Sequence, residues 1–419
     1  MSAIPVPASR AISTTTLRWI AWGSIGLAGF GLWLMLPPVE VRSPVWVFLI
    51  EALAAIGGAT TAGLGLRKLG WSTVGVAGIC LLLGWGATQS SVGHLDGALT
   101  TSSGAGVVDW GFMIDLTFVF ATPLAFAAVG GLMAERSGVM NIGLEGMMLG
   151  GCFFSILGAD KLGSWELGVL AAMLSGATFG LVYAFLAIHM RADQIVGGTA
   201  INFLALGITG YFFIQVYGEN GTPGTGLSQI PDVNLHFLDH IPPKSSGRPS
   251  FWYQAFGHLN LMTWFLFVLL IAVSVYLFRT PWGLRHRSVG EHPRAADTVG
   301  IDVYKVRYFA VITSSVIASL GGAYLALGYT GSFTENMTNG RGFIGLAAMI
   351  AGGWRPGRAF AAALLFGFFG GLATRIQGYG YEPQVLVQTL PYLVTLIVVA
   401  GVVGRSIPPA SIGRPYVKQ

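Results

Sequence analysis

The chain has 419 residues, of which 53% are hydrophobic and only 10% are charged, whereas a soluble domain usually carries roughly 25% charged residues. This composition excludes a soluble globular protein and a disordered chain, and it leaves an integral membrane protein of many helices. The net charge of +5 comes from cations in short loops between apolar runs, which indicates membrane topology and not nucleic-acid binding. The two cysteines, Cys80 and Cys152, lie inside apolar runs, so neither a disulfide framework nor a metal site is expected.

Apolar runs long enough to cross a bilayer as helices recur along the whole chain, because a span needs about 20 such residues. We therefore expect an all-α, polytopic membrane protein with about twelve transmembrane helices. The first run is too long for a signal peptide and is expected to be a retained anchor. The expected spans are residues 17–36, 45–66, 71–88, 112–132, 141–158, 166–189, 195–217, 259–278, 308–328, 342–352, 358–375 and 384–404.

The loops between these spans differ in positive charge, which predicts their orientation. Arginine and lysine gather in alternate loops, most densely in residues 279–307, while residues 89–111 have none and the long loop 218–258 has only two. Short cytoplasmic loops hold most of the cations of a membrane protein. Both termini are therefore expected in the cytoplasm, with residues 406–419 as a cytoplasmic tail.

A polar, glycine-rich segment interrupts the apolar pattern at residues 135–151. It places Asn141 and Glu145 at the start of an expected span. A charge at bilayer depth costs at least about 2.5–3.5 kcal/mol, so Glu145 should face a partner, water or a transport pathway. The alternative is a structural carboxylate bonded to free backbone amides at a broken helix.

An internal repeat links this segment to a second one. Residues 344–353 align without gaps on residues 142–151, with six of ten positions identical, and both copies follow a polar loop that contains asparagine and arginine. Paired glycine-interrupted hydrophobic segments in two halves of a chain indicate a translocation site near the membrane midplane. We therefore expect two related halves with broken helices, which predicts a transporter or channel.

A patterned cytoplasmic stretch follows at residues 280–302. Pro293 can open a short helix there, Glu291 lies at the positive end of that helix, and Gly300 ends it. Its apolar face is formed by Ala295, Ala296 and Val299. A short amphipathic helix of this kind is typical of docking into a groove of a soluble partner. The alternative, a cationic loop that only fixes orientation, explains the arginines but not the helix.

In this order, the two segments resemble the permease subunits of ATP-binding-cassette (ABC) importers, in the branch that handles simple sugars, branched-chain amino acids and nucleosides. The resemblance is strongest to the nucleoside permeases. It rests on Gly130-Gly-Leu132, Glu135-Arg-Ser-Gly-Val139, Asn141-Ile-Gly-Leu-Glu-Gly-Met147, Gly283-Leu-Arg285, Val289-Gly-Glu291, Pro293, Ala295-Ala296 and Arg341-Gly-Phe-Ile-Gly-Leu-Ala-Ala348. It implies a permease core at residues 112–405. Residues 1–111 form additional N-terminal spans that the family does not explain.

The resemblance implies a transport subunit of a bacterial plasma membrane that is not itself an enzyme. Its partners would be ATPase subunits that bind ATP and Mg²⁺, a second permease chain, an extracytoplasmic substrate-binding protein and a small-molecule substrate. No cofactor or metal is expected on this chain, since it has no P-loop. The expected contacts to the ATPase are Arg285, Glu291, Pro293, Arg294, Ala295, Ala296 and Asp297.

The expected substrate is a nucleoside or a similar ribose-containing or sugar solute, whose hydroxyls and flat base require polar partners and aromatic faces. The candidates along its path are Asn141, Glu145, Asn202, Phe203 and Phe343. The competing hypothesis is a stand-alone secondary transporter or channel driven by an ion gradient. Such a carrier needs no docking helix and usually has paired buried acids.

Overall fold

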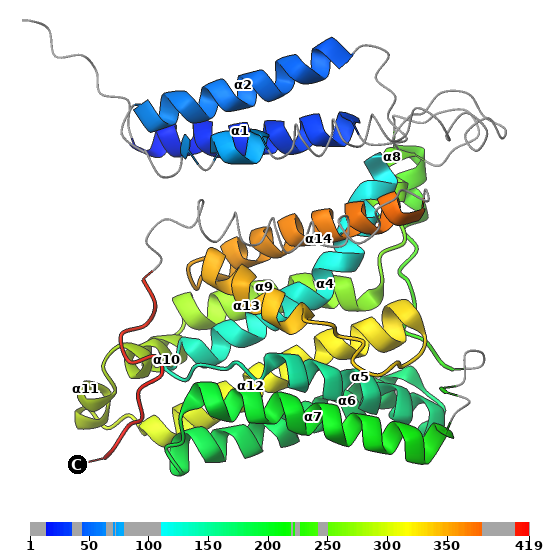
Figure 1. Cartoon of the computed structure of the whole chain (residues 1–419). Coiled ribbons are helices and arrows are strands. Elements are labelled where there is room, and N and C mark those ends of the chain that lie inside the picture. The colour runs from blue at the N-terminus through cyan, green and yellow to red at the C-terminus, as the bar shows by residue number, and fades with distance from the viewer. Residues whose placement is uncertain are drawn as a thin grey trace, which may run out of the picture. The chain divides into compact units, whose positions relative to one another are not determined.

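The computed structural model describes residues 14–35, 44–63, 70–71, 73–78, 110–218, 221–222, 227–241, 250–378 and 407–418. The regular secondary structure in these ranges is helical, apart from an isolated bridge between Asp232 and Asn260 (Figure 1). The described helices divide into two compact units, which are considered separately. One contains the helices before residue 110, and the other runs from Trp110 to Thr374 and includes residues 407–418.

The first unit contains a pair of packed helices, α1 (Thr14–Met35) and α2 (Pro44–Gly63). Small residues let the two backbones approach closely, because Gly57 on α2 lies directly against the Ser24 side chain on α1. These helices match the expected spans 17–36 and 45–66. Of the expected span 71–88 only the first turns are described, and 384–404 lies outside the described residues.

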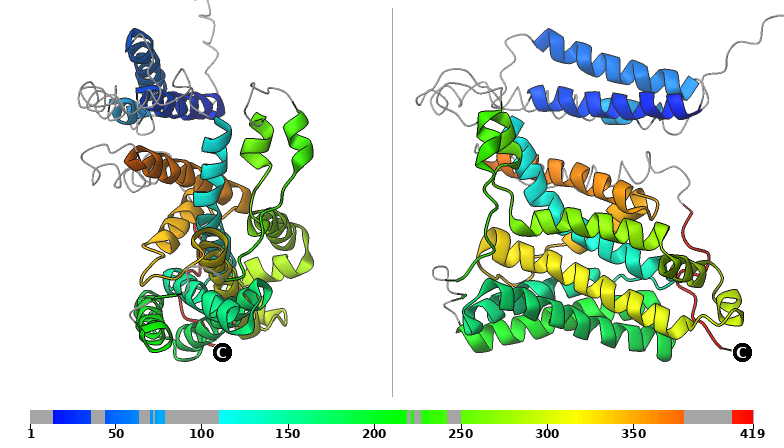
Figure 2. Two further views of the ribbon diagram at one scale, coloured as in Figure 1. Left: turned by 90° about the vertical axis from the view of Figure 1, so that its right-hand side faces the viewer. Right: turned by 180° about the vertical axis from the view of Figure 1, so that it is seen from behind.

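The second unit is a bundle of long helices with several short ones at its ends (Figure 2). Two of the long helices, α6 and α12, continue into π-helical turns at residues 185–189 and 324–330. Its α-helices are α4 (Trp110–Glu135), α5 (Leu144–Leu162), α6 (Trp165–Ala184), α7 (Gln194–Tyr217), α8 (Phe251–Phe256), α9 (Leu261–Arg279), α10 (Pro281–Glu291), α11 (Pro293–Thr298), α12 (Val303–Ala323), α13 (Arg341–Ala351) and α14 (Pro356–Gly378).

Among the described residues, six helical segments are long and apolar enough to cross a membrane. They are residues 111–135, 165–189, 194–217, 261–279, 303–330 and 356–374. Each overlaps one expected span, which confirms a multi-pass helical membrane protein. The expected span 342–352 forms the 11-residue α13, which is only about 17 Å long and cannot cross the roughly 30 Å hydrocarbon core alone.

Side-chain caps explain where several of these helices begin. The side chains of Ser164, Asp193, Asn260, Thr280 and Asp302 accept hydrogen bonds from the first backbone N–H groups of α6, α7, α9, α10 and α12. Those N–H groups have no partner inside their own helix. Polar residues in this apolar sequence therefore mark the starts of three candidate membrane helices and of α10, and one of them begins α12, which also forms a candidate span.

Helix α12 is the packing centre of the second unit, since it contacts α4, α5 and α6. Glycine and serine make this close packing possible. Gly151 on α5 lies against the Ser319 backbone, and Gly176 and Gly180 on α6 face Ser319 and Ser315. Small residues at helix contacts are how membrane helices gain van der Waals packing, because lipid removes the hydrophobic driving force between them.

We expect Gly151→Ala to destabilise the bundle, because the new methyl group would collide with the Ser319 carbonyl of α12. Overpacking of this kind costs about 1–3 kcal/mol. The matched control is Gly207→Ala on α7, where nothing lies within 4 Å of the added carbon. Thermal unfolding of the purified variants in detergent measures the effect, and equal midpoints for both variants would contradict the packing described for α12.

Candidate functional site

The starts of α5 and α13 meet inside the second unit, and Glu145 joins them. Its carboxylate accepts hydrogen bonds from the backbone N–H groups of Gly340, at 2.8 Å, and Gly342, at 2.6 Å. The two backbones nearly touch, since a Cβ added at Gly342 would lie 2.7 Å from the Glu145 Cα. Glu145 is buried and caps α13 from a neighbouring helix. The repeat at 142–151 thus meets the start of the helix that carries the second copy.

Two asparagines fix the start of α5 at the same junction. The Asn141 amide is fully buried, donates to the Ser314 hydroxyl at 3.0 Å and accepts from the Gly143 N–H at 3.1 Å. Asn202 on α7 accepts from the Gly146 N–H at 2.8 Å and donates to the Ile142 carbonyl at 3.1 Å. The structure therefore brings together Asn141, Glu145 and Asn202.

These bonds bear on the two interpretations of Glu145. Both carboxylate oxygens contact free backbone amides at a helix start, as the structural alternative predicts. Ser314 belongs to the junction but carried no sequence signal, because its role depends on a contact between helices far apart in the chain.

The two aromatic residues of the expected substrate path lie on the outside of this unit. Phe203 follows Asn202 on α7 but is 70% exposed, and Phe343 in the first turn of α13 is 46% exposed. The polar and aromatic candidates thus occupy different environments, a buried junction and the surface of the unit.

A second cluster joins the end of α4 to the turn between α13 and α14. The buried Glu135 carboxylate accepts the Trp354 indole N–H at 2.6 Å. The Arg136 guanidinium donates to the Trp354 carbonyl through two nitrogens, at 2.6 and 3.0 Å. Trp354 has a positive φ of 53°, which is uncommon for a residue with a large side chain. The Glu135-Arg-Ser-Gly-Val139 motif therefore holds this turn in place.

Helix α10 packs on the end of α4 and on the Glu135–Val139 turn that follows it. His286 donates from Nε2 to the Met133 carbonyl at 2.9 Å, and Gly290 lies directly against the Arg136 carbonyl. Residues 407–418 cover the end of α10, where the Ser411 N–H donates to the Gly290 carbonyl at 3.0 Å. The buried face of α10 is thus fixed on two sides.

The expected docking segment consists of two helices, because the backbone of His292 is not helical and separates α10 from α11. Pro293 opens α11, as predicted, and Gly300 follows it with a positive φ. The helical structure of residues 281–291 was not predicted. Its signals are Thr280 as N-cap and Pro281 at the first helical position.

The predicted apolar face of this segment divides between two surfaces. Ala296 is buried among Val289 and Val303, so it packs on the chain itself. Ala295 is exposed, and Val299 is 75% exposed.

The charged residues of the segment differ in what they contact. Arg294 is exposed. The Glu291 carboxylate accepts the Ala410 N–H at 3.1 Å, and Arg285 stacks over the Trp282 ring. Asp297 is half-buried.

We expect Glu145→Gln to lower the stability of the protein. The amide NH₂ of glutamine would face one of the two backbone N–H groups that the carboxylate accepts from in the wild type, and that N–H group would lose its acceptor. Leaving a buried donor unsatisfied costs about 1–3 kcal/mol. The control is Glu166→Gln, which also lies in the first turn of a membrane helix but is exposed. Thermal unfolding in detergent should show a lower midpoint for Glu145→Gln only.

The stability of the chain should also depend on the protonation of His286. Burial lowers the pKa of His286 from 6.5 to about 4, and the nearby Arg136 lowers it further, although the Met133 hydrogen bond opposes this. Between these pH values the unfolded chain binds the proton and the folded chain does not, so stability falls as the pH drops from 6.5 to 4. The loss is about 3 kcal/mol at most. The free energy of unfolding of His286→Gln should not fall over this pH range. If the variant loses as much stability as the wild type between pH 6.5 and 4, the prediction is wrong.

Comparison with known proteins places these features in a family. The family described as branched-chain amino acid transport system / permease component matches residues 113–399. The guanosine ABC transporter permease protein NupQ of Bacillus subtilis is 39% identical over 328 residues, covering 73% of this chain and 96% of that protein. The nucleoside ABC transporter permease protein NupC of Lactococcus lactis is 38% identical, with 72% and 95% covered.

A third relative is the putative glucose ABC transporter permease protein TsgC13 of Haloferax volcanii, which is 32% identical over 70% of this chain and 92% of that protein. No solved structure matches the chain. The family match covers well over half of the sequence and includes all the residues of the junction and of α10 and α11. The chain therefore belongs to the family of ABC transporter permease components, which are membrane transport subunits.

Proposed function

We propose that this chain translocates a nucleoside, or a similar ribose-containing or sugar solute, as the permease subunit of an ABC importer. The observation that carries the proposal is the similarity at 38–39% identity to two permeases named for guanosine and nucleosides, along nearly their whole length. The relative named for glucose, at lower identity, keeps a sugar as the second candidate solute.

The proposal includes an assembly around the chain. Two permease chains, the same or related, would form the pore, a substrate-binding protein would deliver the solute from outside, and two ATPase subunits would bind ATP and Mg²⁺ on the cytoplasmic side. We propose about twelve spans in all, with two related halves, in a bacterial plasma membrane and with both termini in the cytoplasm. Residues 1–111 would add spans to the core at 112–405.

The contacts of α10 and α11 support their role in coupling. The exposed Arg294 and Ala295 can meet an ATPase subunit, whereas Ala296 anchors α11 to the chain. A displacement of α11 would reach α10 and then the turn at Glu135–Val139, against which Gly290 packs. From there Arg136 is bonded to Trp354, between α13 and α14. This route joins the proposed docking surface to the helix that Glu145 caps.

Transport through the junction requires some of its bonds to exchange. Because Asn141, Glu145 and Asn202 are bonded to backbone groups in this conformation, a passing solute would compete with those groups for the same side chains. An importer that receives its substrate from a binding protein needs only weak contacts along the path. Phe203 and Phe343 would offer their exposed rings where the pathway reaches the surface of the unit.

The alternative, a carrier driven by an ion gradient, fits these contacts less well. Within the described ranges the buried carboxylates are Glu135 and Glu145, and each accepts hydrogen bonds from N–H groups of the chain. A transported cation would therefore have to displace these N–H groups at either carboxylate. A gradient-driven carrier also has no use for two helices that fold back onto the Glu135–Val139 turn.

The test is recovery of an ATPase subunit with the affinity-purified chain, followed by uptake of labelled guanosine. We expect Arg294→Glu and Ala295→Asp to lose the ATPase and most of the uptake, because both place negative charge on the exposed face of α11. The control is Lys161→Glu at the far end of α5, an exposed cation whose pairing with Asp160 contributes little. Ala296→Asp is unsuitable, since it would disturb the packing of the chain itself.

The two halves of the proposal can fail separately. ATP-independent uptake by a chain that recovers no ATPase would show a secondary carrier. ATPase recovery with uptake of labelled glucose but not of guanosine would leave the importer intact and change the substrate.

A further inference from the structure

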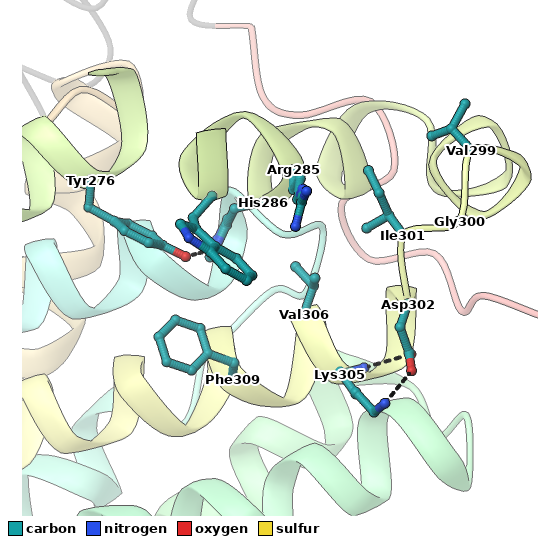
Figure 3. Close-up of a pocket in the computed structure, with 11 residues that line it drawn as sticks. Tyr276, Arg285, His286, Val299, Gly300, Ile301, Asp302, Lys305, Val306 and Phe309 are labelled. Atoms are coloured by element: carbon teal, nitrogen blue, oxygen red, sulfur yellow. Dashed lines mark hydrogen bonds and ion pairs between the residues drawn. The ribbon is translucent and has the colours of Figure 1, made fainter. Parts of the chain in front are cut away.

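A groove of about 690 Å³ lies where α9, α10 and α12 meet (Figure 3). Its volume is in the range of small-molecule sites, about 300–1,000 Å³. Tyr276 of α9 and Val306 and Phe309 of α12 form its apolar part, and Arg285 and Trp282 of α10 lie across from them. The Tyr276 and Phe309 rings are 6.3 Å apart between centroids.

The charges at the groove are mainly positive. The Arg285 guanidinium lies 4.9 Å from the centre of the Trp282 ring, and within the described part of the chain it has no hydrogen bond or ion pair. Lys305 is paired with Asp302 at 3.2 Å, but its side chain is 86% exposed and can reach a ligand. His286 stays neutral near pH 7, because burial lowers its pKa to about 4. Two cations and one carboxylate leave an excess of positive charge.

The position of the groove relates it to the membrane surface. Tyr276 lies in the last turn of the span 261–279, and Phe309 lies six residues into the span 303–330, about 9 Å from the start of α12. The headgroup region of a bilayer is about 5–7 Å thick on each side. With the start of α12 taken as the outer edge of the headgroup region, the charged mouth of the groove lies at headgroup depth, and its aromatic floor lies where acyl chains begin. Tryptophan and tyrosine are typical of this boundary.

An apolar stripe continues from the groove along α12. This helix is mostly buried, but Val306, Phe309, Ile312 and Val316 form one face that is half-buried or exposed. Their spacing of three and four residues places them in a row. Phe309 is 52% exposed. A hydrocarbon chain can lie along this row while a polar group occupies the cationic mouth.

We propose that this groove binds an anionic phospholipid, with the phosphate between Arg285 and Lys305 and an acyl chain along the Val306–Val316 stripe. Basic pockets between membrane helices bind anionic lipid headgroups in other proteins. A soluble ATPase fits the site less well, because the floor belongs to two membrane spans. The proposal does not depend on the transported substrate.

The test uses the purified full-length chain in detergent micelles with added phosphatidylglycerol or phosphatidylcholine of the same acyl chains, and native mass spectrometry measures bound lipid. We expect the wild type to retain phosphatidylglycerol in preference to phosphatidylcholine. Lys305→Gln should weaken phosphatidylglycerol binding about fivefold, since one cation near an anionic lipid contributes about 1 kcal/mol. Asp302→Asn should strengthen it by a similar factor, and asparagine keeps the N-cap of α12.

The two substitutions should change the affinity for phosphatidylglycerol in opposite directions. A folding defect would instead lower the affinity in both variants. The control is Arg414→Gln, an exposed cation that does not line the groove and should leave lipid binding unchanged. Equal retention of the two lipids by the wild type would overturn the proposal. The proposal would also be overturned if the Lys305→Gln variant still bound phosphatidylglycerol but no longer co-purified with an ATPase subunit. The groove would then be a contact surface for the ATPase.

Discussion

The capping of α13 by Glu145 is the contact on which the core of the second unit depends. The first N–H groups of a helix have no partner inside that helix, and a buried N–H group left without an acceptor costs about 1–3 kcal/mol. In this unit two helix starts lie side by side in the protein interior, and Glu145 in the first turn of α5 accepts hydrogen bonds from backbone N–H groups at the start of α13. Asn141 and Asn202 satisfy the start of α5 in the same way. The starts of α5 and α13 therefore stabilise each other.

Helix α10 has two faces with different roles. Its buried face, which includes His286 and Gly290, is fixed to the end of α4 and to residues 407–418. Its exposed face, with Trp282 and Arg285, borders the groove. Because the buried face is held at several points, we expect α10 to move together with the Glu135–Val139 turn and Trp354. The coupling role proposed for α10 and α11 requires a rigid connection of this kind.

Much of this arrangement was predictable from local signals. The apolar runs predicted the described membrane helices, Pro293 and Gly300 marked the limits of α11, and the buried charge of Glu145 indicated that the residue had a partner. The partners themselves were not predictable. Trp354, Ser314 and Met133 join the site through contacts between residues far apart in the chain, for which one sequence contains no periodic signal. Ala296 was expected to face a partner protein. It is instead buried against Val303 on a separate helix, and the local sequence pattern contains no signal for that contact.

The two proposals are linked through α10. A lipid bound in the groove contacts the exposed face of the helix whose buried face transmits the motion of α11. If α10 moves relative to α9 and α12 during transport, the groove changes shape, and the lipid binds the two conformations with different affinity. Thermodynamic linkage then requires the lipid to shift the conformational equilibrium by the same free energy. An anionic lipid would in this way adjust coupling between ATP hydrolysis and transport from a site outside the proposed solute path.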